Sequence, residues 1–226
     1  MKAKKLLSYI IICLFIPIIV IAGSFLFGGK QYAFITAAIT LFACVPFFLS
    51  FENSKHGTTE LVIIAVLTAL SVLGRVIFIA IPGFKPVAAF TILAGMYFGS
   101  EAGFMTGALS AVLSNIFIQQ GPWTPFQMLS WGLIGFIAGL ISNKIKQNKV
   151  LMGIFAAISG ILFSLVMDIW TTLWADGYFN INRYIPTVIA SIPTMVVYAF
   201  SNTLFLLLLI TTVGKRIERL RIKYGI

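Results

Sequence analysis

Charged residues are scarce in this chain of 226 residues. Asp, Glu, Lys and Arg together make up 10% of it, whereas 60% of its residues are hydrophobic. An ordinary soluble domain is about 25% charged and about 45–50% apolar, and a chain this short has too much surface for its volume to hide the excess in a core of its own. The sequence therefore predicts an all-α, polytopic membrane protein, with room for roughly eight crossings of about 20 residues each.

Other scarce residues exclude whole classes of function. No G-x-x-x-x-G-K-[ST] motif occurs, so the chain has no phosphate cradle of its own for ATP hydrolysis. The single histidine, His56, excludes zinc sites with two histidines and bis-histidine haem ligation. Cys13 and Cys44 both lie inside apolar runs, so we expect them to pack as small apolar side chains and not to form a disulfide framework. We therefore expect no enzyme, no metal site and no intrinsic cofactor.

Apolar runs separated by short polar or glycine-rich turns define the expected membrane spans. They are Leu6–Phe27, Gln31–Phe51, Glu60–Ile81, Val87–Phe98, Ala102–Ile118, Thr124–Ile145, Val150–Ala175 and Tyr184–Val213. The polar stretch between the second and third runs is the best internal boundary, which predicts an N-terminal helix pair in residues 1–58 and a core in residues 59–226. The run Val87–Phe98 is too short to cross about 30 Å of hydrocarbon, so we expect a shallow or re-entrant helix that is buried among its neighbours.

Lysines and arginines collect on one side of these expected spans. Twelve of the sixteen lie in the termini and in the loops of one face, whereas the other face has only Lys30, Lys85 and Arg183, and Arg75 lies within a span. Because cytoplasmic loops of membrane proteins are enriched in Lys and Arg, both termini are expected in the cytoplasm. The formal net charge of +10 then indicates contact with anionic lipid rather than with nucleic acid.

Two charged side chains fall at similar depth in the outer halves of two spans. Arg75 lies about fifteen residues into the third run, and Asp168 lies equally far into the seventh, which runs in the same direction. Ionisable groups inside a membrane are expensive, so a buried pair of opposite charges is expected. Either these groups face a water-filled cavity and contact substrate, or they form a structural clamp.

Aromatic and carboxamide side chains gather at the expected outer face. Large aromatics with carboxamides suit a pocket that stacks a flat ligand and fixes its orientation, although tryptophans at this level also form interfacial belts. We favour an outward-facing pocket, because the cytoplasmic ends of the same helices carry no tryptophan. The candidate substrate-binding residues are Arg75, Asn115, Gln119, Gln120, Trp123, Gln127, Trp131, Asp168, Trp170 and Trp174.

Small residues recur at intervals of four, which lets helices approach closely in lipid. Gly95 and Gly99, Gly103 and Gly107, and Gly135 and Gly139 are expected to serve packing within the chain. Ala65 and Ala69 lie in the cytoplasmic half of the third run, where a groove of small residues suits a partner's helix.

From the third run onward, about three-quarters of the chain resembles the S component of energy-coupling factor (ECF) vitamin transporters. One segment that carries the resemblance is Ala65-Val66-Leu67-Thr68-Ala69, followed by Leu73-Gly74-Arg75. Another is Phe90-Thr91-Ile92-Leu93-Ala94-Gly95, then Phe98-Gly99-Ser100-Glu101-Ala102-Gly103-Phe104. The most specific is Gln119-Gln120-Gly121-Pro122-Trp123-Thr124-Pro125-Phe126-Gln127-Met128, which resembles the cobalamin-type branch.

This resemblance implies a six-helix substrate-binding core, to which the N-terminal pair of spans is an addition. It implies a multi-pass protein of the bacterial cell membrane that captures a vitamin, cobalamin or a related corrinoid, on the outer face. A transmembrane coupling subunit, received at Ala65 and Ala69, and two ATPase subunits would supply the energy. The alternative is a stand-alone secondary transporter coupled to protons through Asp168 and Arg75, although the sequence lacks the two related halves that such transporters usually show.

Overall fold

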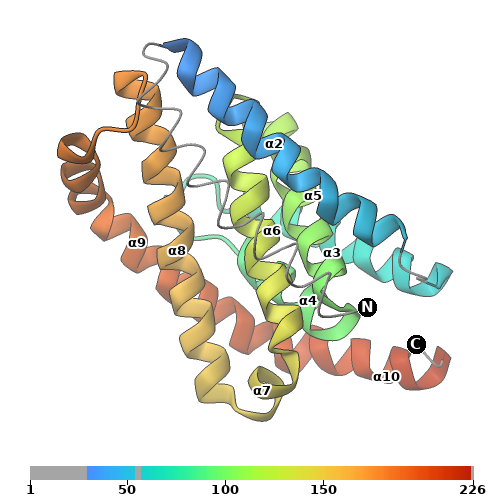
Figure 1. Ribbon diagram of the computed structural model, residues 1–226. Helices are drawn as coiled ribbons and strands as arrows, with labels where there is room; N and C mark the ends of the chain where they lie inside the picture. Colours follow the sequence, from blue (N-terminus) through green and yellow to red (C-terminus); the bar gives the residue numbers. More distant parts are fainter. Residues whose placement is uncertain (1–29, 54–56, 225–226) are drawn as a thin grey trace.

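The computed structural model describes residues 30–53 and 57–224, and within these ranges every regular secondary-structure element is a helix (Figure 1). The elements are α2 (Lys30–Glu52), α3 (Thr58–Ile77), α4 (Val87–Phe98), α5 (Ser100–Ile118), α6 (Thr124–Leu140), α7 (Ser142–Gln147), α8 (Lys149–Asp176), α9 (Ile181–Leu209), the π-helical turn η1 (Ile210–Gly214) and α10 (Lys215–Tyr224). The expected first span, Leu6–Phe27, lies outside the described residues.

The prediction of an all-α, polytopic membrane protein is confirmed. Within the described residues, five helical stretches are long and apolar enough to cross a membrane, namely those of α2, α3, α5 and α8 and the continuous stretch from α9 to α10. For the second to eighth runs the expected boundaries hold to within a few residues, with three exceptions. The third run ends as a helix at Ile77, and the sixth divides at Ile141 into α6 and the short, basic α7. The helix of the eighth run continues past Val213 to Tyr224.

The short helix α4 lies in the middle of the bundle. All twelve of its residues, Val87–Phe98, are buried, and it packs against α3, α5, α6 and α9. A helix surrounded by other helices does not have to match the thickness of the bilayer, because its ends meet protein rather than lipid. The expectation that this run is buried among its neighbours is therefore confirmed. Gly99, at a φ of 98°, ends α4 and lets α5 begin at the next residue.

Glycines bring α5 and α6 into backbone contact. A Cβ atom added at Gly103 would lie 2.3 Å from the carbonyl oxygen of Gly135, and one added at Gly135 would lie 2.3 Å from that of Gly103. A Cβ at Gly95 on α4 would lie 2.2 Å from the same Gly135 oxygen. No side chain fits into such spaces, so the small-residue motifs serve packing within the chain, as the sequence predicts.

The helix α2 packs on the core rather than beside it. It lies against α5, α6 and α8, and it crosses the front of the bundle in Figure 1. The ring of Phe47 stacks on that of Phe104 at 4.0 Å between centroids, and it meets Phe136 edge-on at 5.1 Å. Ser50 donates a hydrogen bond to Glu101 on α5 at 3.3 Å. The predicted boundary at residue 58 stays a prediction, but α2 shares the hydrophobic cluster of the core.

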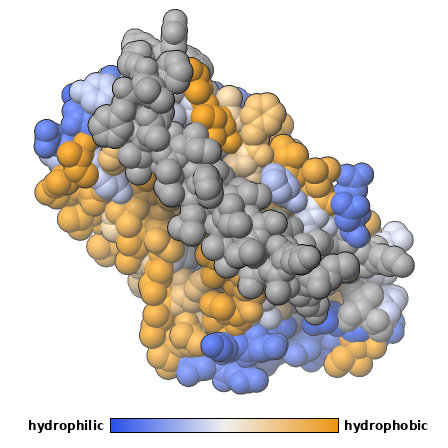
Figure 2. Space-filling view, in the orientation of Figure 1, coloured by the Kyte–Doolittle hydropathy of each residue, from blue (hydrophilic) through white to orange (hydrophobic). Residues whose placement is uncertain are grey.

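Apolar side chains cover the outside of the bundle between two polar ends. Figure 2 shows hydrophobic residues over the left and lower middle of the coloured surface and at the upper right, with hydrophilic residues along the lower edge, at the upper left and at the right. The long helix α9 carries much of this surface, with exposed apolar side chains at Ile181, Ile185, Ile189, Ile192, Val196 and Phe200. A stripe of this length and composition is suited to lipid.

Candidate functional site

A buried network of hydrogen bonds begins at Arg75 near the end of α3. The side chain of Arg75 is 7% exposed, and its guanidinium group points at α5. There it donates one hydrogen bond to Ser114 Oγ at 2.5 Å and another to Asn115 Oδ1 at 2.7 Å. Both partners are neutral, so this buried cation is held by oxygen acceptors and not by a carboxylate.

Asn115 connects the network on α5 to residues of α6. Its amide nitrogen donates to Thr124 Oγ1 at 2.8 Å and to Gln127 Oε1 at 2.9 Å. The Thr124 hydroxyl in turn donates to Gln120 Oε1 at 3.1 Å. The side chains of Asn115, Thr124 and Gln127 are all buried. The amides of Asn115 and Gln120 are each bound through both their oxygen and their nitrogen, so the network holds a defined pattern of donors and acceptors.

A parallel pair of aromatic rings lies beside this network. Trp131 of α6 stacks on Phe163 of α8 with 4.7 Å between ring centroids and 7° between the ring planes. The guanidinium carbon of Arg75 lies 4.9 Å from the centroid of the Trp131 ring. Trp131 itself is 2% exposed. The site therefore combines a flat aromatic face, a cation and orienting amides, which are the groups that bind a flat heteroaromatic ligand.

Lys85 completes the aromatic group from the loop between α3 and α4. Its Nζ lies 4.7 Å from the ring centroid of Tyr198 and 5.8 Å from those of Trp131 and Phe163. The backbone of Lys85 is tied to α9, because its N–H donates to Ser201 Oγ at 2.9 Å and its carbonyl accepts from the same hydroxyl at 3.1 Å. Sequence reasoning missed this residue, since a single lysine in a loop carries no signal of the rings that surround it.

Comparison with protein families identifies the class to which the chain belongs. Residues 55–217 match the family described as the ECF-type riboflavin transporter, S component. The chain belongs to this family. Comparison with curated proteins and with solved structures gives no match. The resemblance to S components is thus confirmed, and the protein is a substrate-binding subunit of an ECF transporter in a cell membrane. The cobalamin-type branch is not supported, because the family is the riboflavin one.

A second aromatic group of the S component lies at the ends of α6 and α8. Trp170 is buried and contacts Phe126 at 5.3 Å and Trp174 at 5.5 Å between ring centroids. Trp123 packs at the edge of this group, whereas Trp174 is 44% exposed. The structure therefore divides the predicted tryptophans into two groups, which meet along α6, and only Trp131 belongs to the network of Arg75.

Two predicted glutamines lie at the margin of the S component's network. Gln120 is exposed, yet it joins the network through Thr124 and also donates from Nε2 to the carbonyl of Val112 at 2.7 Å. Gln119 is exposed at the end of α5. Of the predicted residues, Arg75, Asn115, Gln120, Gln127 and Trp131 are thus brought together.

The expected ion pair between Arg75 and Asp168 is wrong. Asp168 is buried, but its Oδ2 accepts a hydrogen bond from the hydroxyl of Ser191 on α9 at 2.6 Å. Arg75 is bound by Ser114 and Asn115 instead. Similar depth in the membrane did not make the two residues neighbours, because α3 packs on α4 and α5 while α8 packs chiefly on α9. The pair that a proton-coupled secondary transporter would use is therefore not formed between these two residues.

The predicted partner site lies on the outside of the S component. Ala65 and Ala69 are both exposed on α3, on a helix that packs against α4 and α5 with its other side. Large apolar neighbours on the same helix, Leu61, Val62, Val66, Leu70 and Leu73, are exposed as well. This face is available to lipid or to another transmembrane helix.

Burial of Lys85 predicts a pH dependence of stability. Desolvation, and then the nearby charge of Arg75, lower the pKa of Lys85 to about 7 from its ordinary value of 10.5. Between these values the unfolded chain carries a proton that the folded chain has lost. The free energy of unfolding should therefore rise with pH from 7 towards 10, by at most about 1.4 kcal/mol per pH unit. Denaturant titrations in micelles will measure it, and the rise should disappear in a Lys85→Met variant; an unchanged rise would assign it to another group.

Proposed function

We propose that this S component binds riboflavin on the face of Trp131 and delivers it to an ATP-driven importer. The observation that carries the proposal is the buried Trp131–Phe163 pair with the guanidinium group of Arg75 beside it. The isoalloxazine ring of riboflavin is flat, aromatic and edged by two carbonyl oxygens and an N–H. Its face matches an indole ring, and its edge matches a guanidinium group and amides.

The charge of the site also favours a flavin. Arg75 and Lys85 both lie at the ring of Trp131, and the hydrogen-bond partners of Arg75 are neutral. Cations in this position stabilise electron-rich carbonyl oxygens of a bound ligand. Asn115 and Gln127 add both donors and acceptors, as an imide edge requires.

Access to Trp131 requires a change in the loop that carries Lys85. The loop from residue 78 to residue 86 brings Lys85 against the aromatic pair and is bound to Ser201. In this proposal the loop moves aside to admit riboflavin and returns to cover it. The excess of lysine and arginine at the other end of the helices supports placing this loop on the outer face of the membrane.

Energy would come from other chains in this proposal. A transmembrane coupling subunit would dock on the exposed face of α3, and two ATPase subunits would hydrolyse ATP. The absence of a phosphate-binding motif from the sequence supports this division of labour.

Bulky side chains at Ala65 and Ala69 should separate binding from transport. A double Ala65→Leu, Ala69→Leu variant is expected to bind riboflavin within about twofold of the wild type, since both residues are exposed on α3 whereas Arg75 of the same helix is buried. ATP-dependent uptake should fall at least about tenfold, because close approach of helices in a membrane depends on small residues. Ala190→Leu on the exposed face of α9 is the control. Undiminished uptake by the double variant would remove the docking assignment.

Mass spectrometry of the ligand retained by the purified full-length protein tests the proposed substrate. The expected result is riboflavin in the wild type and little or none in an Arg75→Ala variant. A corrinoid mass would contradict the assignment of substrate. Retention of riboflavin by both proteins would support riboflavin as the substrate but would show that Arg75 is not part of its binding site.

A further inference from the structure

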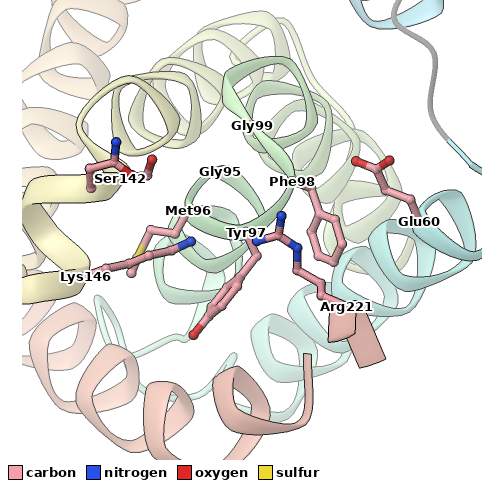
Figure 3. A pocket seen from close by; sticks show the side chains of 10 residues that line it. Glu60, Gly95, Met96, Tyr97, Phe98, Gly99, Ser142, Lys146 and Arg221 are labelled. Atoms are coloured by element: carbon pink, nitrogen blue, oxygen red, sulfur yellow. The ribbon is translucent and has the colours of Figure 1, made fainter. Parts of the chain in front are cut away.

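A pocket lies at the far end of α4 from Lys85. It has a volume of about 370 Å³ and is formed by the end of α4 together with α3, α7 and α10. This size is within the range of small-molecule sites. Figure 3 shows its side chains, which include Glu60, Tyr97, Ser142, Lys146 and Arg221. None of the residues of the Trp131 network lines it, so it is a separate feature of the molecule.

Two cations from different helices meet at this pocket. Lys146 of α7 holds its Nζ 4.4 Å from the ring centroid of Tyr97, and Arg221 reaches the same pocket from α10. In Figure 3 both project towards Tyr97, while Glu60 lies at the opposite margin beyond Phe98. Burial and the charge of Arg221 both lower the pKa of Lys146, against the opposing effect of Glu218. A bound anion would relieve this repulsion between like charges.

Neutral donors accompany the cations. Ser142 supplies a hydroxyl group and Asn143 an amide, both at the start of α7. A guanidinium group, an ammonium group, a hydroxyl and an amide together suit the several oxygens of a phosphate group. Basic residues outnumber acidic ones on the helices around the pocket: α7 and α10 carry seven lysines and arginines and one acid, Glu218, and α3 adds Glu60 at the margin.

Exposed apolar side chains lie on α10 and at the ends of the two helices that flank α7 in the chain. Ile222 on α10 is 80% exposed, Val150 at the start of α8 is 71% exposed, and Leu140 at the end of α6 is 51% exposed. A basic helix with apolar residues on another face is typical of elements that lie at the level of lipid headgroups. Apolar side chains do not stabilise a free phosphate ion, whereas they can pack against the acyl chains of a lipid.

We propose that this pocket binds the phosphate group of an anionic membrane lipid, between Lys146 and Arg221. The lipid holds α10 against the ends of α4 and α7. It also adds a contact between the S component and its bilayer that is independent of the vitamin site.

Native mass spectrometry of the full-length protein, titrated with phosphatidylglycerol in a neutral detergent, tests this proposal. A double Lys146→Gln, Arg221→Gln variant should bind this lipid roughly tenfold to thirtyfold more weakly than the wild type. The matched control is Lys144→Gln, Arg219→Gln, which removes the same charge from exposed positions of the same two helices and should change binding less than about twofold. Lys146→Gln alone should weaken binding about fivefold, and it serves if the double variant does not fold.

Three results would overturn the proposal. Equal losses in the double variant and its control would mean that the attraction is diffuse and involves no pocket. Unchanged lipid binding in the double variant, with or without loss of assembly with partner subunits, would mean that the cations serve something other than lipid. Displacement of the lipid by millimolar inorganic phosphate would mean that the pocket takes a free anion. Thermal melting and riboflavin titration of each variant confirm that it is folded.

Discussion

Replacing Trp131 with alanine is expected to weaken riboflavin binding by about a hundredfold or more. The substitution removes the ring that stacks on Phe163 and faces the guanidinium group of Arg75. Buried aromatic residues at the centre of a binding site are typically worth about 2–4 kcal/mol on truncation, which corresponds to about thirtyfold to a thousandfold in affinity. Isothermal titration calorimetry with the protein in lipid nanodiscs will measure the change.

Truncation of a buried tryptophan also leaves a cavity, so a loss of stability must be separated from a loss of contact. Phe136→Ala on the same helix empties a comparable space where α6 meets Phe47, outside the Arg75 network. It is expected to lower the melting temperature while keeping riboflavin affinity within about threefold. Trp131→Phe should recover most of the affinity by keeping a flat ring. Equal loss of binding in Trp131→Ala and Phe136→Ala would show that unfolding, not stacking, causes the effect.

The second large effect is expected at the crossing of α5 and α6. Gly135→Ala places a Cβ atom 2.3 Å from the carbonyl oxygen of Gly103 and 2.6 Å from Thr91 Cγ2, so the helices must separate. Overpacking a core typically costs about 1–3 kcal/mol, and here the obstacle is backbone. We expect the melting temperature in micelles to fall by at least about 5 °C.

Gly153→Ala is the matched control for this substitution. It is also a glycine within a helix, but an added Cβ would have only Thr203 Cγ2 near it, at an ordinary 3.6 Å. Alanine at such a position usually stabilises a helix by about 0.5–1 kcal/mol, so the melting temperature should stay or rise. A Gly135→Ala protein that melts at the wild-type temperature would mean that the close approach of α5 and α6 is not required.

Much of the fold follows from local sequence. The length of an apolar run and the Gly and Pro residues at its ends are properties of a single segment. They predicted the bounds of α4, Val87–Phe98, correctly. Spacing of small residues is also local, and it predicted the packing of Gly103 and Gly135. The division of the sixth run at Ile141 was missed. The polar residues of α7 lie at the end of this run, where the end of a single membrane span also becomes polar.

The site could be predicted only in part, because its partners come from different helices. Amides next to the α5–α6 turn were recognisable, since Asn115 and Gln127 are separated by one short loop. The contacts of Arg75 with Trp131 and of Lys85 with Tyr198 depend on how whole helices pack, which no local pattern reports. The mistaken pairing of Arg75 with Asp168 has the same origin. Position along a span gives the depth of a residue in the membrane, but it does not say which neighbouring helix the side chain faces.

A structure of the protein with riboflavin bound tests the central claim most directly. We predict the isoalloxazine ring in contact with the face of Trp131, with Arg75 or the amides of Asn115 and Gln127 within hydrogen-bonding distance of its carbonyl edge. A flavin seated among Trp170 and Trp174 and away from Trp131, or in the pocket between α7 and α10, would contradict this account.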